Sequence, residues 1–409
     1  MSVDLSTPLT LPCGAVLKNR LIKAPMTEGL ADPMNRATAR HERLYEAWAA
    51  GGAAALITGN VQVDRRFLER PGNVVVDGNG GEEALAAYAR AGTANDTHLW
   101  MQIGHAGRQT PRRVNPNPVA PSAVPLALPD SAFGAPRALS GAEVEDVVAR
   151  FAHVAGAARR AAFTGLQVHA AHGYLISEFL SPLANRRDDK WGGTLENRAR
   201  LLREVVRACR HAVGPDFPVT VKLNSSDFQK GGFDHEECLS VVRWLEEDGV
   251  DLLELSGGNY ENPAMMAGTR GAEEIAESTV QREAYFLRYA RSVRAATSLP
   301  LMVTGGFRSR AAMDAALADG DTDTIGIGRP MCVETDLPNR LLADPTAEAI
   351  SYEREIRPAK GALGWFCLQL IRIADGEEAD PALSGEQAIH DYLDNEERTA
   401  AALADRVLV

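Results

Sequence analysis

The chain has 409 residues, 45% of them hydrophobic, and a formal net charge of −12. This composition is typical of a globular protein with a large core, and the acidic balance argues against nucleic acid or an anionic membrane as a partner, because both require basic patches. No run approaches about 18 apolar residues and the N-terminus has no signal-peptide pattern, so we expect a cytoplasmic protein without a membrane span.

The first predicted element is a small hairpin within residues 7–20, where a turn at Cys13-Gly14 separates two short extended pieces. Eight short apolar runs follow, each succeeded by an amphipathic stretch long enough for a helix. The runs are LIKAPM (21–26), AALITGN (54–60), LWMQIGH (99–105), LQVHAAH (166–172), VTVKLN (219–224), LLELSGG (252–258), LMVTGGF (301–307) and TIGIGRP (324–330). Strands buried on both faces have such sequences, and parallel strands need helical crossovers. Eight such units predict an α/β protein with a single (β/α)8 TIM barrel, whose floor the hairpin would close.

An open, doubly wound sheet is the alternative arrangement. Its first strand would normally precede a glycine-rich dinucleotide fingerprint, whereas APMTEGLAD (24–32) is not one. Residues 106–140 are rich in proline and have no helical period, which predicts a long loop above the barrel. Two further helices are expected within 346–409. We therefore assign residues 1–376 to the barrel and 377–409 to a C-terminal helical extension that is not an independent domain.

Every apolar run changes character at its C-terminal end, which is where barrel active sites are built. The seventh and eighth runs end in TGGF and GIGRP. Glycines at Gly306 and Gly328 let backbone N–H groups approach a phosphate, and Arg329 supplies charge-assisted hydrogen bonds. These ends predict a site for a phosphorylated ligand or cofactor, although glycines at such junctions also serve simply to make tight turns.

Two other strand ends carry polar side chains suited to a cofactor. Lys222 ends an apolar strand, so its ammonium needs an anionic or electron-rich partner, and an isolated lysine there could equally form a Schiff base in an aldolase-type barrel. Gln102 has one acceptor and two donors, which suit a planar heterocycle with carbonyl and N–H groups. Together with the phosphate site, these residues describe flavin mononucleotide (FMN) better than a sugar phosphate.

Residues 168–182 read VHAAHGYLISEFLSP and bring His169, His172 and Tyr174 to the end of the fourth run. At the mouth of a barrel strand the three would face one pocket. A His-x-x-His pair can also bind a metal, but no third ligand is obvious nearby, and two core histidines with a packed tyrosine are the structural alternative. The five cysteines are dispersed and form no CxxC pair, so we expect reduced thiols.

Six segments together match motifs of one known family: KNRLIKAPMT (18–27), QIGHAGRQ (102–109), HAAHGYLISEFLSPLANRRDDKWGGTLENRARLL (169–202), SGGNYE (256–261), TGGFRS (304–309) and IGIGRP (325–330). From about Leu9 to Gly376 the chain resembles the old yellow enzyme family of FMN-dependent ene-reductases, also called NADH:flavin oxidoreductases. The long central block with WGGTLENR is the most specific of these motifs.

The resemblance implies noncovalent FMN at the C-terminal mouth of the barrel. Gln102 would bind the pyrimidine carbonyl and imide, and Lys222 would sit by N1 and O2. The phosphate would be held by Gly306, Gly328 and Arg329. The ring would be lined by Ala24, Pro25, Met26 and Thr27, with the Thr27 hydroxyl near O4 and N5 and the backbone of Gly59 packed close.

The resemblance also implies the reaction. NADPH or NADH would reduce the FMN, and the reduced flavin would then pass a hydride from N5 to the β-carbon of an activated alkene, an α,β-unsaturated carbonyl or nitro compound. His169 and His172 would bind the substrate oxygen, and Tyr174 would protonate the α-carbon. Both half-reactions would share one pocket.

Some alternatives stay open at this point. A flavin barrel could instead act in electron transfer or redox sensing, although such a protein has no need of a proton donor above the flavin. Many family members have arginine where this chain has Lys222, which keeps the charge but loses the bidentate fork. The natural substrate, which loops 106–140 and 260–275 would set, remains open, as do the choice between NADH and NADPH and the formation of a homo-oligomer.

Overall fold

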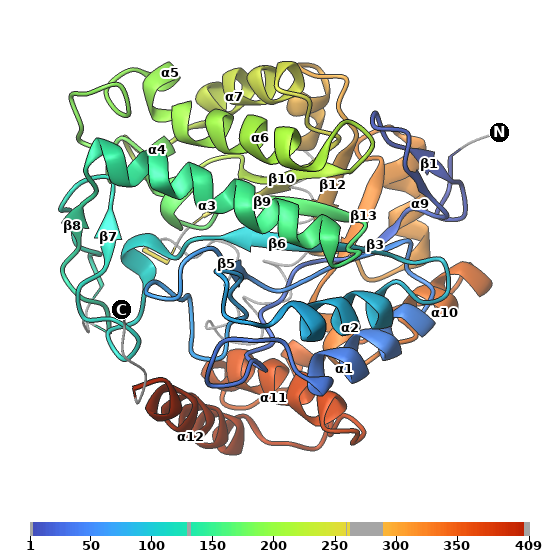
Figure 1. The fold of residues 1–409 in the computed structure, drawn as a ribbon. Helices are drawn as coiled ribbons and strands as arrows, with labels where there is room; N and C mark the ends of the chain where they lie inside the picture. Colours follow the sequence, from blue (N-terminus) through green and yellow to red (C-terminus); the bar gives the residue numbers. More distant parts are fainter. Residues whose placement is uncertain (1–2, 129–131, 259, 262–288, 405–409) are drawn as a thin grey trace.

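In the computed structural model, which describes residues 3–128, 132–258, 260–261 and 289–404, eight parallel strands form a closed ring. The strands lie in the centre of the molecule (Figure 1). Each strand pairs in parallel with its two neighbours, and the pairing of β4 with β6 closes the ring. The strands are β3 (Leu21–Lys23), β4 (Ala55–Ile57), β6 (His98–Gly104), β9 (Gly165–Ala170), β10 (Val219–Asn224), β11 (Leu252–Ser256), β12 (Leu301–Thr304) and β13 (Thr324–Ile327). The predicted (β/α)8 barrel is therefore confirmed, and the open sheet is wrong.

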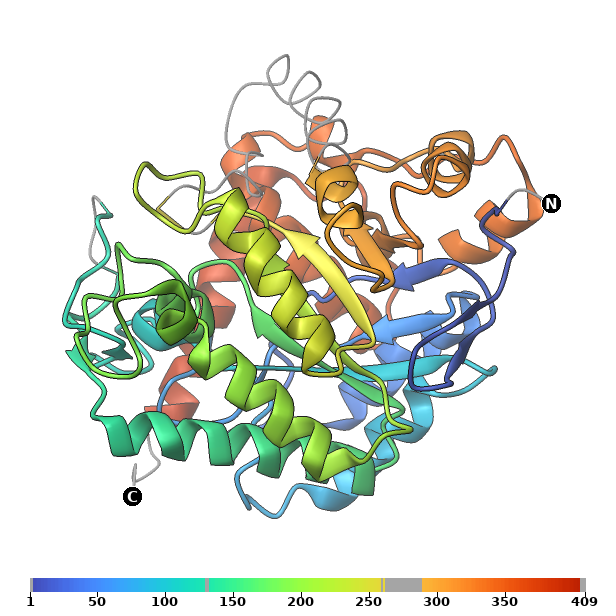
Figure 2. The ribbon, with the colours of Figure 1, turned by 90° about the horizontal axis from the view of Figure 1, so that it is seen from above.

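Helices surround this ring, as the view from above shows (Figure 2). Helix α3 illustrates why they begin where they do: the Ser140 hydroxyl accepts from the N–H of Glu143, whose carboxylate accepts from the N–H of Ser140. The helices are α1 (Ala39–Ala50), α2 (Glu82–Gly92), α3 (Gly141–Arg160), α4 (Leu175–Leu180), α5 (Leu195–Arg198), α6 (Arg200–Val213), α7 (His235–Glu247), α9 (Arg310–Ala318), α10 (Leu337–Ala343), α11 (Ala362–Ala374) and α12 (Gly385–Ala404). None of the described helices is long and apolar enough to cross a membrane.

The predicted hairpin closes the floor of the barrel. Strands β1 (Leu9–Thr10) and β2 (Val16–Leu17) pair antiparallel around a turn in which Gly14 has a φ of 90°. Leu11 and Leu17 are buried against inward-facing strand residues, among them Trp100 and Met302. This apolar plug fills the N-terminal end of the ring and leaves its C-terminal end for polar side chains.

The described parts of the loops at that C-terminal end contain short regular elements. After β5 (Val61–Gln62), the proline-rich stretch 106–140 includes one turn of 3-10 helix, η1 (Gly107–Gln109), and two strands, β7 (Val119–Ala120) and β8 (Arg137–Ala138), that pair in parallel. Of the second loop expected to set substrate choice, residues 262–275 lie outside the described residues. Further 3-10 turns are η2 (Arg329–Cys332), η3 (Tyr352–Arg354) and η4 (Ala359–Gly361).

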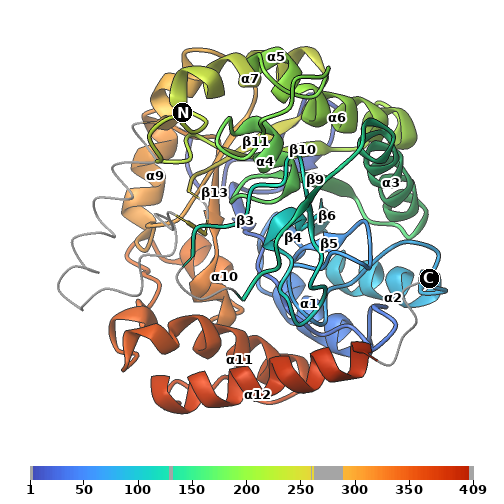
Figure 3. The ribbon, with the colours of Figure 1, turned by 90° about the vertical axis from the view of Figure 1, so that its left-hand side faces the viewer.

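The C-terminal helices α11 and α12 lie side by side on one flank of the barrel (Figure 3). Helix α11 also packs on α1, so this layer continues the outer shell of helices. The extension expected from residue 377 is thus a helix packed on the shell, while the boundary at residue 376 stays a prediction.

Candidate active site

The barrel interior brings together three of the predicted site residues. Gln102 on β6, His169 on β9 and Lys222 on β10 are each at most 4% exposed. In the strand register, Gln102 lies opposite Gln167, and Lys222 lies opposite both His169 and Glu254. Register partners point to the same face of a sheet, so these side chains all project into the ring.

A continuous chain of polar contacts joins these interior residues. The amide of Gln102 donates to the side-chain oxygen of Gln167 at 2.8 Å, and the amide of Gln167 donates to Glu254 at 2.9 Å. The ammonium of Lys222 and the hydroxyl of Thr304 each contact the other carboxylate oxygen of Glu254 at 2.8 Å. Gln167 and Glu254 were not predicted as site residues. An acidic residue inside the apolar run LLELSGG could have indicated Glu254.

The ion pair with Glu254 bears on the Schiff-base alternative for Lys222. Lys222 is 5% exposed in its side chain and Glu254 is fully buried, so the ammonium and the carboxylate form a buried ion pair. An ammonium has no lone pair with which to attack a carbonyl. The anionic partner expected for Lys222 is therefore the carboxylate of Glu254. This pairing disfavours a Schiff-base lyase that acts through Lys222.

The two histidines of the His-x-x-His pair meet at the end of β9, with ring centroids 5.1 Å apart. The N–H of Ala171 donates to Nδ1 of His169 at 3.2 Å, so the neutral ring carries its proton on Nε2. Nε2 of His172 lies 2.6 Å from the hydroxyl of Ser256, at the end of β11. Burial lowers the pKa of both rings well below the usual value, and the charge of Lys222 adds to this. Both histidines are thus neutral hydrogen-bonding groups at neutral pH.

The metal-binding alternative for this histidine pair needs a third ligand nearby. In the ranges that the structure describes, no three or more His, Cys, Asp or Glu side chains are arranged to hold a metal ion. The third histidine of the central motifs, His105, serves the loop instead: its Nδ1 accepts from the N–H of Gly107 at 3.0 Å, and its ring stacks on Phe67.

Tyr174 immediately precedes α4 and stands edge-on to His169, with ring centroids 4.9 Å apart. Its hydroxyl lies 2.9 Å from that of Tyr260, and the carboxyl of Glu69 is near enough to act on it electrostatically. Burial raises the pKa of Tyr174 well above its usual value, and the charge of Glu69 raises it further. Tyr174 is therefore protonated at neutral pH. The loop residues Tyr260 and Glu69 were not predicted, because loop conformation is not encoded in a strand pattern.

The segment after β3 forms one wall of the mouth. Ala24 is buried, while Pro25, Met26 and Thr27 are partly exposed. Gly59 after β4 packs against this wall, because a Cβ there would lie 2.6 Å from the carbonyl oxygen of Met26. The N–H of Gly59 donates to Glu28 at 2.9 Å. Glycine is thus required at this position by close approach to the neighbouring backbone.

The ends of β12 and β13 have the open backbone that a phosphate needs. Gly305 and Gly306 have φ angles of 111° and 85°, and a Cβ on Gly305 or Gly328 would meet nothing within 4 Å. Arg329 follows directly, and its guanidinium lies 3.7 Å from Glu353, which also binds Arg308 at 2.6 Å. Backbone N–H groups of glycines with open space beside them, together with an arginine, can bind a phosphate group, so these residues fit FMN.

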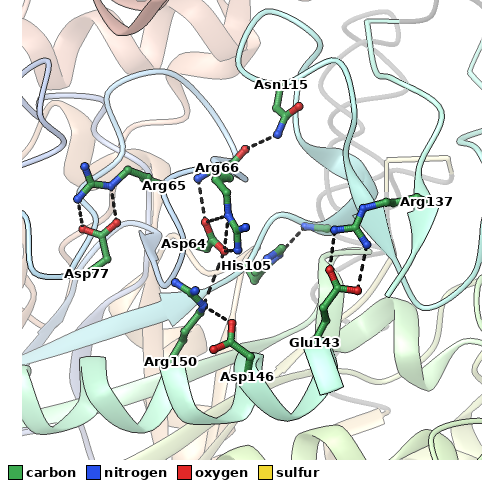
Figure 4. Close-up of polar contacts among 11 residues, drawn as sticks. Asp64, Arg65, Arg66, Asp77, His105, Asn115, Arg137, Glu143, Asp146 and Arg150 are labelled. Atoms are coloured by element: carbon green, nitrogen blue, oxygen red, sulfur yellow. Dashed lines mark hydrogen bonds and ion pairs between the residues drawn. The ribbon is translucent and has the colours of Figure 1, made fainter. Parts of the chain in front are cut away.

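The segment between β5 and α2, which carries Glu69, is fastened by ion pairs at both ends (Figure 4). Asp64 binds Arg66 at 2.6 Å and lies 3.8 Å from Arg150 of α3, while Arg65 binds Asp77 at 2.5 Å. These contacts fix the segment that supports the tyrosine.

The middle of the same segment is tied to the C-terminal helix α12. Arg70 and Glu396 form a 2.5 Å ion pair in which both side chains are at most 7% exposed, and the guanidinium of Arg70 lies over the ring of Tyr392. Arg70 also donates to the carbonyl oxygen of Thr27 at 3.4 Å. The tail, to which the sequence assigned no role, thus reaches the wall of the site.

The model of the NADH:flavin oxidoreductase / NADH oxidase family matches residues 4–346. The chain is 36% identical to the "NADH-dependent flavin oxidoreductase iliE" of Hypocrea jecorina over 82% of this chain and 88% of that protein. It is 37% identical to the protein of the same name from Neonectria sp. over 86% of this chain, and spans about half of that protein's length (49%). The structure of morphinone reductase in complex with tetrahydroNAD is similar with a TM-score of 0.67 and 25% identity, over 86% of this chain and 94% of that one.

The fold and the polar mouth define a (β/α)8 barrel oxidoreductase. The chain belongs to the NADH:flavin oxidoreductase / NADH oxidase family, that of the old yellow enzymes, and its cofactor is FMN. The resemblance drawn from the sequence motifs is therefore confirmed.

Burial of neutral histidines makes a pH-dependent contribution to stability. Burial lowers the pKa of His105 from 6.5 to about 4. Below pH 6.5 the unfolded chain therefore binds a proton that the folded chain does not, and stability is lost as the pH falls from 6.5 towards 4. The loss amounts to about 3 kcal/mol for this residue. We expect the destabilisation caused by His105→Gln, measured by urea unfolding, to shrink between pH 7.5 and pH 4.5; an unchanged difference would contradict a neutral His105.

Proposed function

We propose that this FMN-dependent oxidoreductase reduces the C=C bond of activated alkenes, namely α,β-unsaturated carbonyl or nitro compounds, with NADH or NADPH as the hydride donor. The observation that carries this proposal is the convergence of two neutral histidines and a protonated tyrosine at one strand end. FMN, when bound, supplies the hydride.

The cofactor roles of the barrel residues are part of this proposal. Gln102 and Lys222 would hold the pyrimidine edge of FMN, and Gly306, Gly328 and Arg329 would hold its phosphate. The remaining wall of the ring site would consist of Ala24, Pro25, Met26, Thr27 and Gly59. The buried polar interior and the open glycine ends support this assignment.

The histidines would bind the substrate oxygen. The proton on Nε2 of His169 is free of the backbone contact that Nδ1 makes, so it is available to donate to a carbonyl or nitro oxygen. Ser256 holds the ring of His172 at its Nε2, so that His172 can make a second hydrogen bond to the substrate oxygen. Two neutral donors polarise the oxygen and lower the electron density at the β-carbon.

Tyr174 would then donate its proton to the α-carbon. Formation of a phenolate next to a charged Glu69 is costly, so the step is favoured when Glu69 is itself protonated. Burial raises the pKa of Glu69, and its carboxyl can return a proton to Tyr174. An electron-transfer or redox-sensing barrel, the alternative function, would not use this donor.

Binding of a phenol tests the oxygen site. His169→Ala and His172→Ala should each weaken the binding of p-hydroxybenzaldehyde to the FMN-loaded protein by about tenfold to a hundredfold, because each removes a hydrogen bond to the ligand oxygen. Isothermal titration calorimetry measures the dissociation constants. His153→Ala is the matched control, since His153 is exposed on α3. Equal dissociation constants in all four proteins would refute this role for the pair.

A further inference from the structure

We propose that Glu254 is a positioning residue that fixes the placement of Lys222 and Gln102, offsets the positive charge of Lys222 and thereby holds down the reduction potential of bound FMN. This inference rests on the proposed cofactor site. It concerns a residue that neither cofactor nor substrate would touch in the roles given above, because its contacts all run to other side chains.

The hydrogen bonds of Glu254 are fully used within the barrel. One carboxylate oxygen accepts from Gln167 at 2.9 Å, and the other contacts Lys222 and Thr304 at 2.8 Å each. Glu254 is 0% exposed, and Gln167 and Thr304 are also buried. The carboxylate is thus held in one place by three donors from three other strands, β9, β10 and β12.

The position of Glu254 along β11 explains why its side chain lies between the barrel floor and the mouth. Residues i, i+2 and i+4 of a strand line one face, and on β11 these are Leu252, Glu254 and Ser256. Leu252 belongs to the apolar plug of the barrel floor, and Ser256 binds His172 at the mouth. Glu254 therefore occupies the layer directly beneath the pocket.

Two of the predicted flavin contacts depend on this one carboxylate. Lys222 binds it directly, and Gln102 binds it through Gln167. Displacement of Glu254 would release both groups. Because the pair is at most 5% exposed, solvent screens it little, and the negative charge of Glu254 largely cancels the positive charge that Lys222 presents to its surroundings.

The direction of the effect follows from this cancellation. A positive charge near the pyrimidine edge stabilises the reduced, more electron-rich form of the cofactor over the oxidised form. Glu254→Gln keeps the side-chain shape and removes the negative charge, so the reduced form gains affinity and the reduction potential rises. Lys222→Gln removes the positive charge and lowers the potential. In the double variant the two changes oppose each other.

The test is the midpoint potential of the FMN-loaded wild type, of both single variants and of the double variant, measured by equilibration with a reference dye. We expect Glu254→Gln to favour binding of reduced over oxidised FMN by about tenfold more than the wild type does, which corresponds to a rise of about 30 mV for a two-electron couple. Glu254→Asp, which retains the charge, should stay nearer the wild type. A potential that is unchanged or lower in Glu254→Gln would overturn the proposal.

If Glu254→Gln does not fold because it leaves Lys222 buried without its partner, the double variant replaces it in the test, because it removes both charges of the pair. The potential of Glu254→Gln/Lys222→Gln should then lie above that of Lys222→Gln alone, and equal values would overturn the proposal. None of these measurements uses alkene turnover. Failure of the enone reaction would therefore refute the proposed function without affecting this result, and an absent potential shift would refute only the role of Glu254.

Discussion

Replacement of Tyr174 by phenylalanine should slow alkene reduction by about 10²-fold to 10⁴-fold and leave reduction of the flavin by NADH nearly unchanged. Only the reaction with the alkene requires a proton on carbon, and the Tyr174 hydroxyl is the protonated group beside the histidine pair. Anaerobic stopped-flow absorbance of the flavin separates the two half-reactions.

Tyr260→Phe distinguishes the two neighbouring hydroxyls, which lie 2.9 Å apart. Its effect on alkene reduction should be much smaller than that of Tyr174→Phe, because Tyr260 has no contact with the histidines among the described interactions. If Tyr174→Phe slowed flavin reduction and alkene reduction equally, Tyr174 would not be the proton donor. A large loss in Tyr260→Phe alone would transfer that role to Tyr260.

Replacement of Glu396 by alanine should destabilise the fold by about 3 kcal/mol, because it leaves the guanidinium of Arg70 buried without its ion-pair partner. Urea unfolding measures this loss. The same variant should release FMN more readily, since Arg70 also holds the carbonyl oxygen of Thr27 at the wall of the site.

Glu397→Ala is the matched control for this variant. Glu397 is the next residue on α12 and is exposed, so its removal should change stability by less than about 0.5 kcal/mol. Equal stability of the two variants would show that the tail helix does not support the site.

The barrel itself could be predicted from the sequence because strands buried on both faces appear as continuous apolar runs, and the sequence contains eight of them. The predicted run 219–224 coincides with β10, whereas the run 21–26 extends past β3, which ends at Lys23. The extra residues belong to the mouth. Pairing ends where the chain turns towards the site, and an apolar pattern does not mark that point.

The polar interior was harder to predict. Gln102 and Lys222 were predicted as cofactor contacts because they stand near strand ends, and that role stays a prediction. Glu254 gave no such signal, because it lies between two leucines and its partners come from other strands. Contacts such as Gln167 with Glu254 depend on strand register, which only the closed ring defines. The link from Arg70 to Glu396 joins residues 326 positions apart and left no local pattern.

Alkene reduction through bound FMN is tested by the absorption spectrum of the purified, FMN-loaded protein during anaerobic addition of NADH and then of cyclohexenone. We expect a yellow protein that bleaches with NADH and regains its colour with the enone, with cyclohexanone as the product. A protein that bleaches with NADH and stays bleached with cyclohexenone and with other activated alkenes would keep the family and contradict alkene reduction.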